Sequence, residues 1–379
     1  MKKTTNFLLL SALIASLPAS ADIAFNGFAS IVAGGTVSGN DRLWGYSDSD
    51  YFKSGSVFGL QASSDLSEGL SLTAQIIARG ADDWDPKFEW AYLGYRVNDN
   101  FKVLIGRQRT PFYMYSDFLD VSYAYPWISP PVGVYNLPVD SVDGISAIYD
   151  FDMGDFSSTL HVIYGNNTDE VTLFGESVKP DFKNITGASF TTTKDWLTLR
   201  AAYFTAKNTI PISSTKPLAQ GWQMTPFPEI ANSITLYEKD TSFAEVGFQF
   251  DFENFFVVGE YTELQIKDSF YPKEKSSYIM AGYRFSDKVA HITFGQDKSS
   301  AKIITGAVPY GLDSTLDYLK AQTDGLSDSR EEDSNYITVG LRWDFHDSAA
   351  FKLEYSDFQS DVDSSRDSGL LKMALVTVF

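Results

Sequence analysis

The sequence predicts an all-β protein that spans a membrane as a single transmembrane antiparallel β-barrel of 16 strands. Three observations predict this fold: an export segment with no apolar helix after it, apolar and polar residues that alternate in segment after segment, and short turns that alternate with long loops. A closed barrel fits the first observation because an unpaired backbone group in hydrocarbon costs several kcal/mol, and a barrel has no open edge.

The composition of the 379 residues excludes several classes of protein. The longest strongly apolar run, Phe7–Leu17, is about half the length that a helix needs to cross a bilayer. Aromatic residues make up 15% of the chain, far too many for a disordered protein. Because there is no cysteine and there are only three histidines, we expect no thiol chemistry, no metal site and no cofactor. The net charge of −19 excludes nucleic acid as a partner, since phosphates require a basic face.

Residues 1–21 have the features of a signal peptide. Lys2 and Lys3 supply a positive start, Phe7–Leu17 is the apolar stretch, and Ala19-Ser20-Ala21 fits the small-x-small cleavage rule. A buried N-terminal helix is the alternative, but it does not account for these three features in this order. We therefore expect an exported protein whose residues 22–379 form a single barrel domain.

Alternation with a period of two is the main evidence for strands. In Leu70–Arg79 every second residue from Leu70 to Ala78 is apolar and the intervening ones are polar, with Ile77 as the exception. Tyr336–Phe345 and Ala350–Phe358 alternate in the same way. Soluble β-sandwiches also alternate, so this pattern does not by itself distinguish them from a membrane barrel.

The spacing of the strands favours a membrane barrel. Seven short polar turns alternate with longer loops such as Lys207–Thr241 and Asp297–Ser334, and outer-membrane barrels have short turns on one side and long loops on the other. The polar faces carry Arg and Lys. Aromatic residues gather near strand ends, as interfacial girdles require. They are Phe101, Phe156, Trp196, Phe255, Phe285 and Trp343.

The predicted strands number sixteen, which places both chain ends on the periplasmic side. They cover residues 23–33, 56–63, 70–79, 88–97, 101–109, 145–151, 156–164, 184–191, 196–206, 242–251, 255–265, 276–285, 289–296, 335–345, 350–358 and 369–379. An alternative with eighteen strands requires a hairpin hidden inside one of the long loops.

The last strand ends on an aromatic residue. Phe379 is the final residue, and Thr377, Leu375, Met373 and Leu371 share its face at every second position. Together with the signal peptide, the sixteen alternating strands and Gly106-Arg107-Gln108 at the end of the fifth strand, this terminus resembles the Gram-negative general porins. The resemblance covers the whole mature chain.

The resemblance implies a homotrimer of barrels in the outer membrane, in contact with lipid and lipopolysaccharide. It also implies that the barrel-assembly machinery reads Phe379 as an insertion signal. In each barrel the third loop would fold inward, with acidic residues on that loop facing basic residues on the wall. The expected function is a water-filled channel for passive diffusion of ions and small hydrophilic solutes.

The segment Thr110–Gly144 follows the fifth strand and has the composition of such a loop. It contains four aspartates, no Lys or Arg, eight aromatic residues and five prolines, which forbid continuous strand pairing. The candidate constriction residues are Asp117, Asp120, Asp140, Asp143, Tyr113, Tyr115 and Trp127. A loop inside a lumen needs aromatic residues to pack against the wall. The alternative is an outward loop that covers the barrel mouth or a neighbouring subunit.

Strand parity predicts the basic wall opposite this loop. An arginine facing lipid at the midplane costs about 2–4 kcal/mol. The residues assigned to the lumen in this way are Arg79, Arg96, Arg200, Arg284, Arg342 and Lys352. Arg107 and Arg109 share parity with Ile105, so a bulge at Gly106 would be needed to turn them inward. Otherwise both lie above the hydrocarbon and reach water.

Three other functions are alternatives to a general diffusion channel. A channel that prefers a sugar or another small nutrient is suggested by the aromatic residues of Thr110–Gly144, since aromatic faces stack on sugar rings. An outer-membrane enzyme would need a nucleophile or activated water beside a histidine, and His161, His291 and His346 form no recognisable motif. A soluble periplasmic β-protein would not need detergent for extraction. We expect no enzyme.

Deleting Phe379 tests the assembly signal. We expect the deletion to lower the amount of protein in the outer membrane several-fold, while barrels that do fold keep the heat resistance of the wild type. Immunoblots of membrane fractions and heat-modifiable gel mobility measure the two effects separately. Unchanged outer-membrane levels would contradict the assignment.

Overall fold

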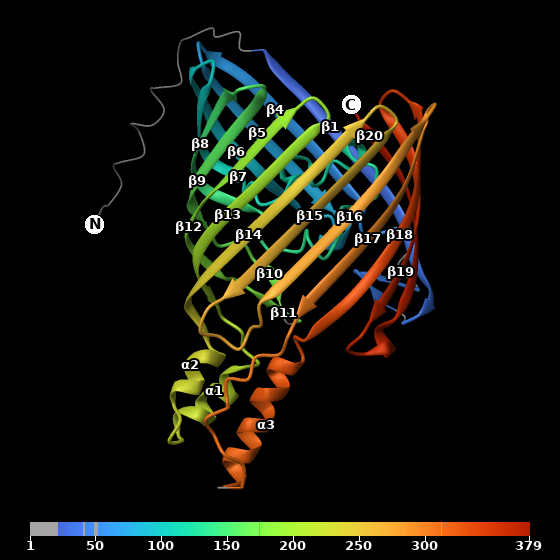
Figure 1. Ribbon diagram of the computed structural model, residues 1–379. Helices are drawn as coiled ribbons and strands as arrows, with labels where there is room; N and C mark the ends of the chain where they lie inside the picture. Colours follow the sequence, from blue (N-terminus) through green and yellow to red (C-terminus); the bar gives the residue numbers. More distant parts are fainter. Residues whose placement is uncertain (1–21, 41, 49–51, 174, 312) are drawn as a thin grey trace, which may run out of the picture.

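The wall of the protein is a closed antiparallel β-barrel (Figure 1). The computed structural model describes residues 22–40, 42–48, 52–173, 175–311 and 313–379. Within them sixteen strands pair in a ring, each with its neighbours along the chain, and the first pairs with the last. The predicted signal peptide, residues 1–21, lies outside the described residues.

Each of the sixteen predicted segments overlaps one strand of the barrel. The barrel strands are β1 (Ile23–Gly39), β4 (Val57–Ser67), β5 (Leu70–Arg79), β6 (Pro86–Asn98), β7 (Phe101–Arg109), β8 (Ser141–Met153), β9 (Phe156–Asn167), β12 (Asp181–Lys194), β13 (Leu197–Ile210), β14 (Leu236–Phe252), β15 (Phe255–Ile266), β16 (Glu274–Phe285), β17 (Lys288–Ser299), β18 (Glu332–His346), β19 (Ala349–Ser360) and β20 (Ser368–Val378). The predicted number of strands is confirmed.

Hairpins do occur inside the long loops, but they do not join the wall. β2 (Arg42–Leu43) pairs only with β3 (Tyr46–Ser47), and β10 (Val171–Leu173) pairs only with β11 (Glu176–Val178). Each pair forms a separate two-stranded sheet. The eighteen-strand alternative is therefore wrong.

The barrel closes between β1 and β20. The register runs from Phe28 opposite Val378 to Gly39 opposite Ser368. Beyond it, the Gly27 N–H donates to the Phe379 carbonyl oxygen at 2.7 Å, and the Phe379 N–H donates to the Gly27 carbonyl at 2.9 Å. A Cβ atom at Gly27 would lie 2.3 Å from the Phe379 ring. Glycine at this position therefore lets the terminal ring lie flat on the seam.

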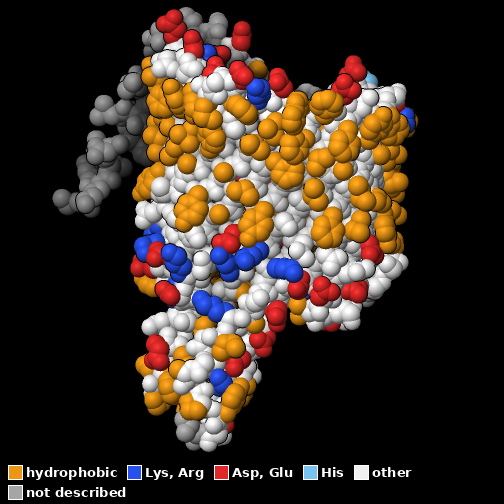
Figure 2. Space-filling model, viewed as in Figure 1, with side chains coloured by type: hydrophobic (Ala, Val, Ile, Leu, Met, Phe, Trp, Pro, Cys, Tyr) orange, Lys and Arg blue, Asp and Glu red, His pale blue; other side chains and the backbone are white. Residues whose placement is uncertain are grey.

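The two faces of the wall differ as the alternation predicts. On β5, Leu72 and Ile76 face outward and are 42% and 39% exposed, whereas Thr73 and Gln75 face inward and are buried. Ile77, the exception in the pattern, faces inward and is 1% exposed, in contact with Phe28 and Val57. Figure 2 shows the resulting apolar band on the outer wall.

The two ends of the barrel also differ. Seven two-residue turns join strands at the end where the C-terminus lies, and the longer loops emerge at the other end (Figure 1). Five of these turns contain a residue with left-handed backbone, including Gly69 and Gly154 with φ of 76° and 65°. Left-handed residues suit tight hairpin turns because their twist matches that of the strands.

Two of the long loops fold together into a small helical cap beyond the barrel rim (Figure 1). One loop holds α1 (Lys216–Gln223) and α2 (Glu229–Ile234), and the other holds α3 (Ser314–Asp328). Asp313 caps α3 by accepting from the backbone N–H groups of Thr315 and Leu316 at 2.8 and 3.2 Å.

The cap has its own apolar core. Trp222 of α1 is fully buried, and its indole N–H donates to the Thr323 hydroxyl of α3 at 2.7 Å. Ile234 and Leu319 pack around it. Within the part of the chain that the structure describes, no helix is long and apolar enough to cross a membrane.

Candidate functional site

The third long loop, residues 110–140, folds into the lumen. It leaves the wall after β7 and returns at β8. The Phe112 ring packs edge-on against Phe204 of β13 and Phe243 of β14, with centroids 4.9 and 5.2 Å apart. The Trp127 indole N–H donates to the Thr293 hydroxyl of β17 at 2.8 Å. The predicted inward loop is confirmed, and the outward alternative is wrong.

Most of the aromatic residues of this loop form its internal core. Tyr113 and Trp127 are buried. The Tyr115 ring lies 5.7 Å from Trp127 and 6.4 Å from Tyr135. These rings pack against one another inside the loop. Phe118, by contrast, is 51% exposed and lines the cavity on the short-turn side of the loop.

Three of the predicted wall cations hold the loop by its backbone. The Lys352 ammonium is fully buried and donates to the carbonyl oxygen of Tyr125 at 2.8 Å and to those of Ser122 and Trp127. Arg342 donates to the Tyr123 carbonyl at 2.7 Å. These contacts compensate for backbone oxygens that would otherwise be buried without a partner.

Arg200 has the same task on the opposite wall. Its guanidinium donates to the Pro111 carbonyl oxygen and lies 3.3 Å from the Glu245 carboxylate. None of these three cations therefore stands free in the lumen as an electrostatic wall. Instead, their hydrogen bonds to loop carbonyl oxygens fix the path of the loop.

Acidic residues of the wall also bind the loop, by accepting hydrogen bonds from its backbone N–H groups. They are not among the functional residues predicted from the sequence. Glu260 of β15 accepts from the Met114 backbone N–H at 2.9 Å and from the Tyr278 hydroxyl at 2.7 Å. Glu354 of β19 accepts from the Ile128 N–H at 2.6 Å. The sequence signal for Glu260 and Glu354 is a carboxylate at a strand position that strand parity assigns to the lumen.

The centre of the site is a cluster of two carboxylates and two guanidiniums. Asp120 of the loop lies 2.9 Å from Nη2 of Arg79 and 2.6 Å from Nη2 of Arg109. Glu89 of β6 lies 3.2 and 2.9 Å from the same two groups. A carboxylate on the loop thus faces cations on the wall, as the sequence suggested for this part of the lumen.

Burial alone would raise the pKa of the Asp120 carboxyl group, but the charges of Arg109 and Arg79 hold the pKa at about 2. Asp120 is therefore ionised at any physiological pH. The loop carries a fixed negative charge at the point where it meets β5 and β7.

A backbone irregularity places Glu89 in this cluster. Gln75 of β5 pairs with Trp90, and Ile76 pairs with Phe88, so Glu89 is the extra residue of a β-bulge in β6. A bulge re-aims a side chain that strict alternation would direct outward. Arg109 ends β7 beside this bulge.

Arg107 lies elsewhere, and this corrects the expectation for the fifth strand. The register between β7 and β8 runs without a shift, with Ile105 opposite Ile145 and Arg107 opposite Asp143. Ile105 and Ile145 are exposed on the outer face, so Arg107 and Asp143 share that outward face. The inward turn that a bulge at Gly106 was expected to give both arginines is not seen at Arg107, whereas Arg109, the last residue of β7, is buried and reaches Asp120 and Glu89. Arg107 is bound instead by Asp143 and Asp169.

Other predicted residues lie away from the cluster. The Arg284 guanidinium pairs with Asp251 at 2.6 Å near a short turn, and Arg96 is exposed at the same end of the barrel. Asp140 is 3.7 Å from Arg109, at the edge of the cluster. Asp117 faces a cavity on the short-turn side of the loop.

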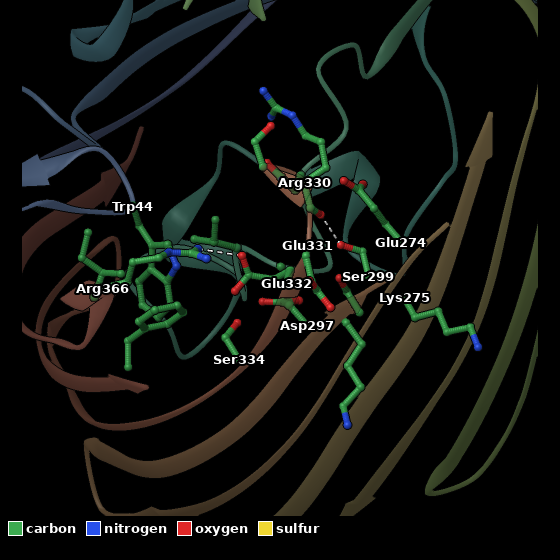
Figure 3. Close-up of a pocket in the computed structure, with 18 of the residues that line it drawn as sticks. Trp44, Glu274, Lys275, Asp297, Ser299, Arg330, Glu331, Glu332, Ser334 and Arg366 are labelled. Carbon is green, nitrogen blue, oxygen red and sulfur yellow. Dashed lines mark hydrogen bonds and ion pairs between the residues drawn. The ribbon is translucent and has the colours of Figure 1, made fainter. Parts of the chain in front are cut away.

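Cavities lie on both sides of the loop. On the short-turn side, a cavity of about 780 Å³ is lined by Asp117 and by wall residues such as Lys102 and His161. On the long-loop side, a cavity of about 670 Å³ carries charges of both signs (Figure 3). There Arg366 reaches Glu332 at 2.6 Å, beside Asp297. The loop separates these two cavities, so a solute that crosses the barrel must pass it.

Comparison with known sequences decides the family. Residues 8–363 match the sequence profile of the Gram-negative porins. The chain belongs to the Gram-negative porin family. No curated protein matches this porin by sequence.

Solved structures share the fold at low sequence identity. The outer-membrane channel DcaP of Acinetobacter baumannii is 13% identical, with 96% of this chain and 99% of that chain covered and a TM-score of 0.60. Salmonella typhi OmpF, in complex with daunomycin, is 12% identical, with 96% and 99% covered and a TM-score of 0.58. OmpT of Vibrio cholerae, in a trimer form, is 14% identical, with 95% and 99% covered and a TM-score of 0.55.

Family and fold together identify an outer-membrane channel for passive diffusion. Its wall supplies the lumen, and the loop of residues 110–140 narrows it. Ions and polar solutes pass such a filter without a bond being made or broken.

Acid should weaken the anchoring of the loop through Asp120. The pKa of this carboxyl is about 2 in the folded protein, below the ordinary value of about 3.9, so its stabilisation is complete above pH 4 and is lost as the pH falls through 2. We expect Asp120→Asn to lower stability at pH 7 by about 2 kcal/mol and to abolish this part of the acid dependence. The temperature of the gel-mobility shift, measured across a pH series, reports both effects.

Asp117→Asn is the matched control for this experiment, because it is the same exchange in the same loop. It should leave the pH profile close to that of the wild type. An equal loss of stability in both variants at pH 7 would show that the cluster around Asp120 has no special role.

Lys352→Met should loosen the middle of the loop. The exchange keeps the length of the side chain but leaves three buried carbonyl oxygens without their donor, at a cost of about 1–3 kcal/mol for each buried group. We expect backbone amides of residues 120–130 to exchange hydrogen for deuterium at least tenfold faster. Lys102→Met, on the wall of the short-turn cavity, should leave this exchange unchanged.

Proposed function

We propose that this porin is a general diffusion channel for ions and small hydrophilic solutes, that it works as a homotrimer, and that it is not an enzyme. The observation that carries the proposal is the charged contact between Asp120 on the loop and Arg79 and Arg109 on the wall. We propose that these opposed charges set up a local field where solutes pass the loop. Polar solutes align in such a field. Apolar solutes are disfavoured, because they must displace water that the charges order.

The histidines of the chain support a filter over a catalyst. His291 is buried against the Trp127 ring and lies 3.7 Å from Glu354, within the anchoring of the loop. The backbone N–H of Ser348 donates to His346 Nδ1 at 3.2 Å within a short turn. His161 faces the short-turn cavity. Nucleophilic catalysis needs a nucleophile within hydrogen-bond reach of an accessible base, and two of these imidazoles are committed to structure.

A substrate-preferring channel has less support. The sugar-track interpretation rests on the aromatic residues of the loop, and several of them, including Tyr113, Tyr115 and Trp127, pack against one another and the wall. We therefore propose simple size- and charge-dependent flux, without a saturable sugar site on the loop.

The homotrimer is supported by the trimer form of the similar OmpT structure and by the apolar outer wall. Contact with lipopolysaccharide is supported by basic side chains just beyond that apolar wall, on the long-loop side (Figure 2). Those on the outer face of β12, β13 and β16 include Lys183, Lys207 and Lys275. Cations at this level can pair with lipid phosphates. We also propose that the assembly machinery recognises Phe379.

Selectivity in planar bilayers tests the proposed function. At 1 M salt the Debye length is about 3 Å, so surface charges are screened while charges at the loop still act on ions in the lumen. We expect mild cation selectivity that weakens as salt rises. The variant Asp117→Asn/Asp120→Asn should shift the reversal potential towards anions more strongly than Glu331→Gln/Glu332→Gln/Asp333→Asn in 1 M salt.

A larger effect of the triple variant at 1 M would mean that the loop of residues 110–140 does not control the current, and the proposal would fail. Current steps in groups of three would support the trimer, and single steps would argue against it. Saturable block of the current by sugars would favour the substrate-preferring alternative.

A further inference from the structure

A third cavity of the lumen has a different chemistry from the two on either side of the loop. It has a volume of about 330 Å³ and lies between the loop of residues 110–140 and the inner faces of β12 to β16, on the long-loop side. Its wall is mostly apolar. The aromatic and aliphatic side chains that dominate it are Phe112, Phe182, Phe204, Phe243, Leu236 and Ile266.

Charge is nearly absent from this cavity. The long-loop cavity is lined by several lysines, arginines and carboxylates, and the short-turn cavity by Lys102, Arg109 and Asp117. Here the ionisable carboxylate is Glu274, at one edge, and it accepts a hydrogen bond from the Tyr271 hydroxyl. A charged solute would lose its hydration on entry without gaining a partner, at a high cost in free energy.

Two polar atoms on one side of the cavity are without protein partners. Asn208 is 1% exposed, and its side-chain oxygen accepts no hydrogen bond from any described residue. The Thr241 hydroxyl is buried and unpaired within the same part of the chain. Ala206 and Thr241 are opposite each other in the register of β13 and β14, and Asn208 is two residues further on the same face. The two polar atoms therefore belong to neighbouring positions of the wall.

We propose that this cavity binds a small uncharged amphipathic molecule, with an aromatic or aliphatic body of roughly ten heavy atoms and one hydrogen-bond donor. The size follows from the volume, since a water molecule occupies about 30 Å³ of liquid. The apolar side chains accommodate the body, and rotation of the buried Asn208 side chain brings its unpaired oxygen to the donor. A partly apolar pocket with a few convergent polar groups is the usual form of a small-molecule site.

The position of the cavity excludes larger occupants. It lies inside the barrel, behind the loop, so neither a second copy of the chain nor a lipid surface has access to it. The site goes beyond the proposed diffusion of hydrophilic solutes, because it would retain molecules that the charged cluster at Asp120 disfavours. If no ligand binds this cavity, the proposed diffusion function still stands. If the diffusion function is wrong, the binding site still stands.

Indole is a suitable probe, since it has nine heavy atoms and a single N–H donor on an aromatic body. Equilibrium binding to the full-length mature protein in lipid nanodiscs avoids detergent in the cavity. We expect saturable binding of indole with one site per chain, and no measurable binding of glucose or of the charged indole-3-acetate. Absence of saturable indole binding would overturn the proposal.

A pair of alanine exchanges on β13 locates the site. Ala206 lines the cavity, so Ala206→Phe should fill it and reduce indole affinity at least tenfold. Ala201, on the outward face of the same strand, serves as the matched control, and Ala201→Phe should bind indole as the wild type does. Equal binding by both variants would place the indole elsewhere and contradict the proposal. Heat-modifiable gel mobility verifies that each variant is folded.

Asn208→Leu tests the polar end without filling the cavity. We expect indole affinity to fall roughly five- to tenfold, the effect of losing one hydrogen bond, whereas 1-methylindole, which has no donor, should bind the variant as well as it binds the wild type. A parallel loss for both probes would show that Asn208 shapes the pocket only and does not accept from the ligand, which would refute the polar part of the proposal.

Discussion

The structure depends on one constraint: every backbone group of the wall must find a partner, because hydrocarbon offers none. Antiparallel pairing between chain neighbours satisfies fifteen of the sixteen seams, and the last requires that β1 meet β20. Hydrogen bonds between Gly27 and Phe379 extend that seam to the final residue. The closed wall then defines a lumen in which a long loop can be held away from both lipid and bulk water.

The need to pair buried backbone groups also applies to the loop of residues 110–140. This segment forms no strand, so its buried backbone groups cannot be paired by a neighbouring ladder. Lys352 and Arg342 supply donors to its carbonyl oxygens, and Glu260 and Glu354 supply acceptors to its N–H groups. Charged side chains on the lumen face thus substitute for a sheet. Only the cluster around Asp120 leaves loop and wall charges directly opposed.

The strands, the turns and the inward loop are predictable from the sequence because each has a local signal: alternation, turn residues, and a loop rich in aromatic residues and proline. The bulge at Glu89 is not predictable, because it leaves no trace in composition, and the glycine at position 106 points to the wrong strand. The roles of Lys352 and Arg342 are not predictable either, since a basic residue on a lumen face fits both a free wall charge and a backbone anchor. The helices of the cap were hidden in segments understood only as long loops.

The helical cap has a consequence for how this porin can vary at the cell surface. Loops usually accept insertions and deletions independently of one another. Here the loop with α1 and the loop with α3 share one core, and Trp222 of the first is hydrogen-bonded to Thr323 of the second. A change of length in one of them exposes apolar side chains of the other. The two loops are therefore expected to diversify together, as a single unit of surface variation built from separate parts of the gene.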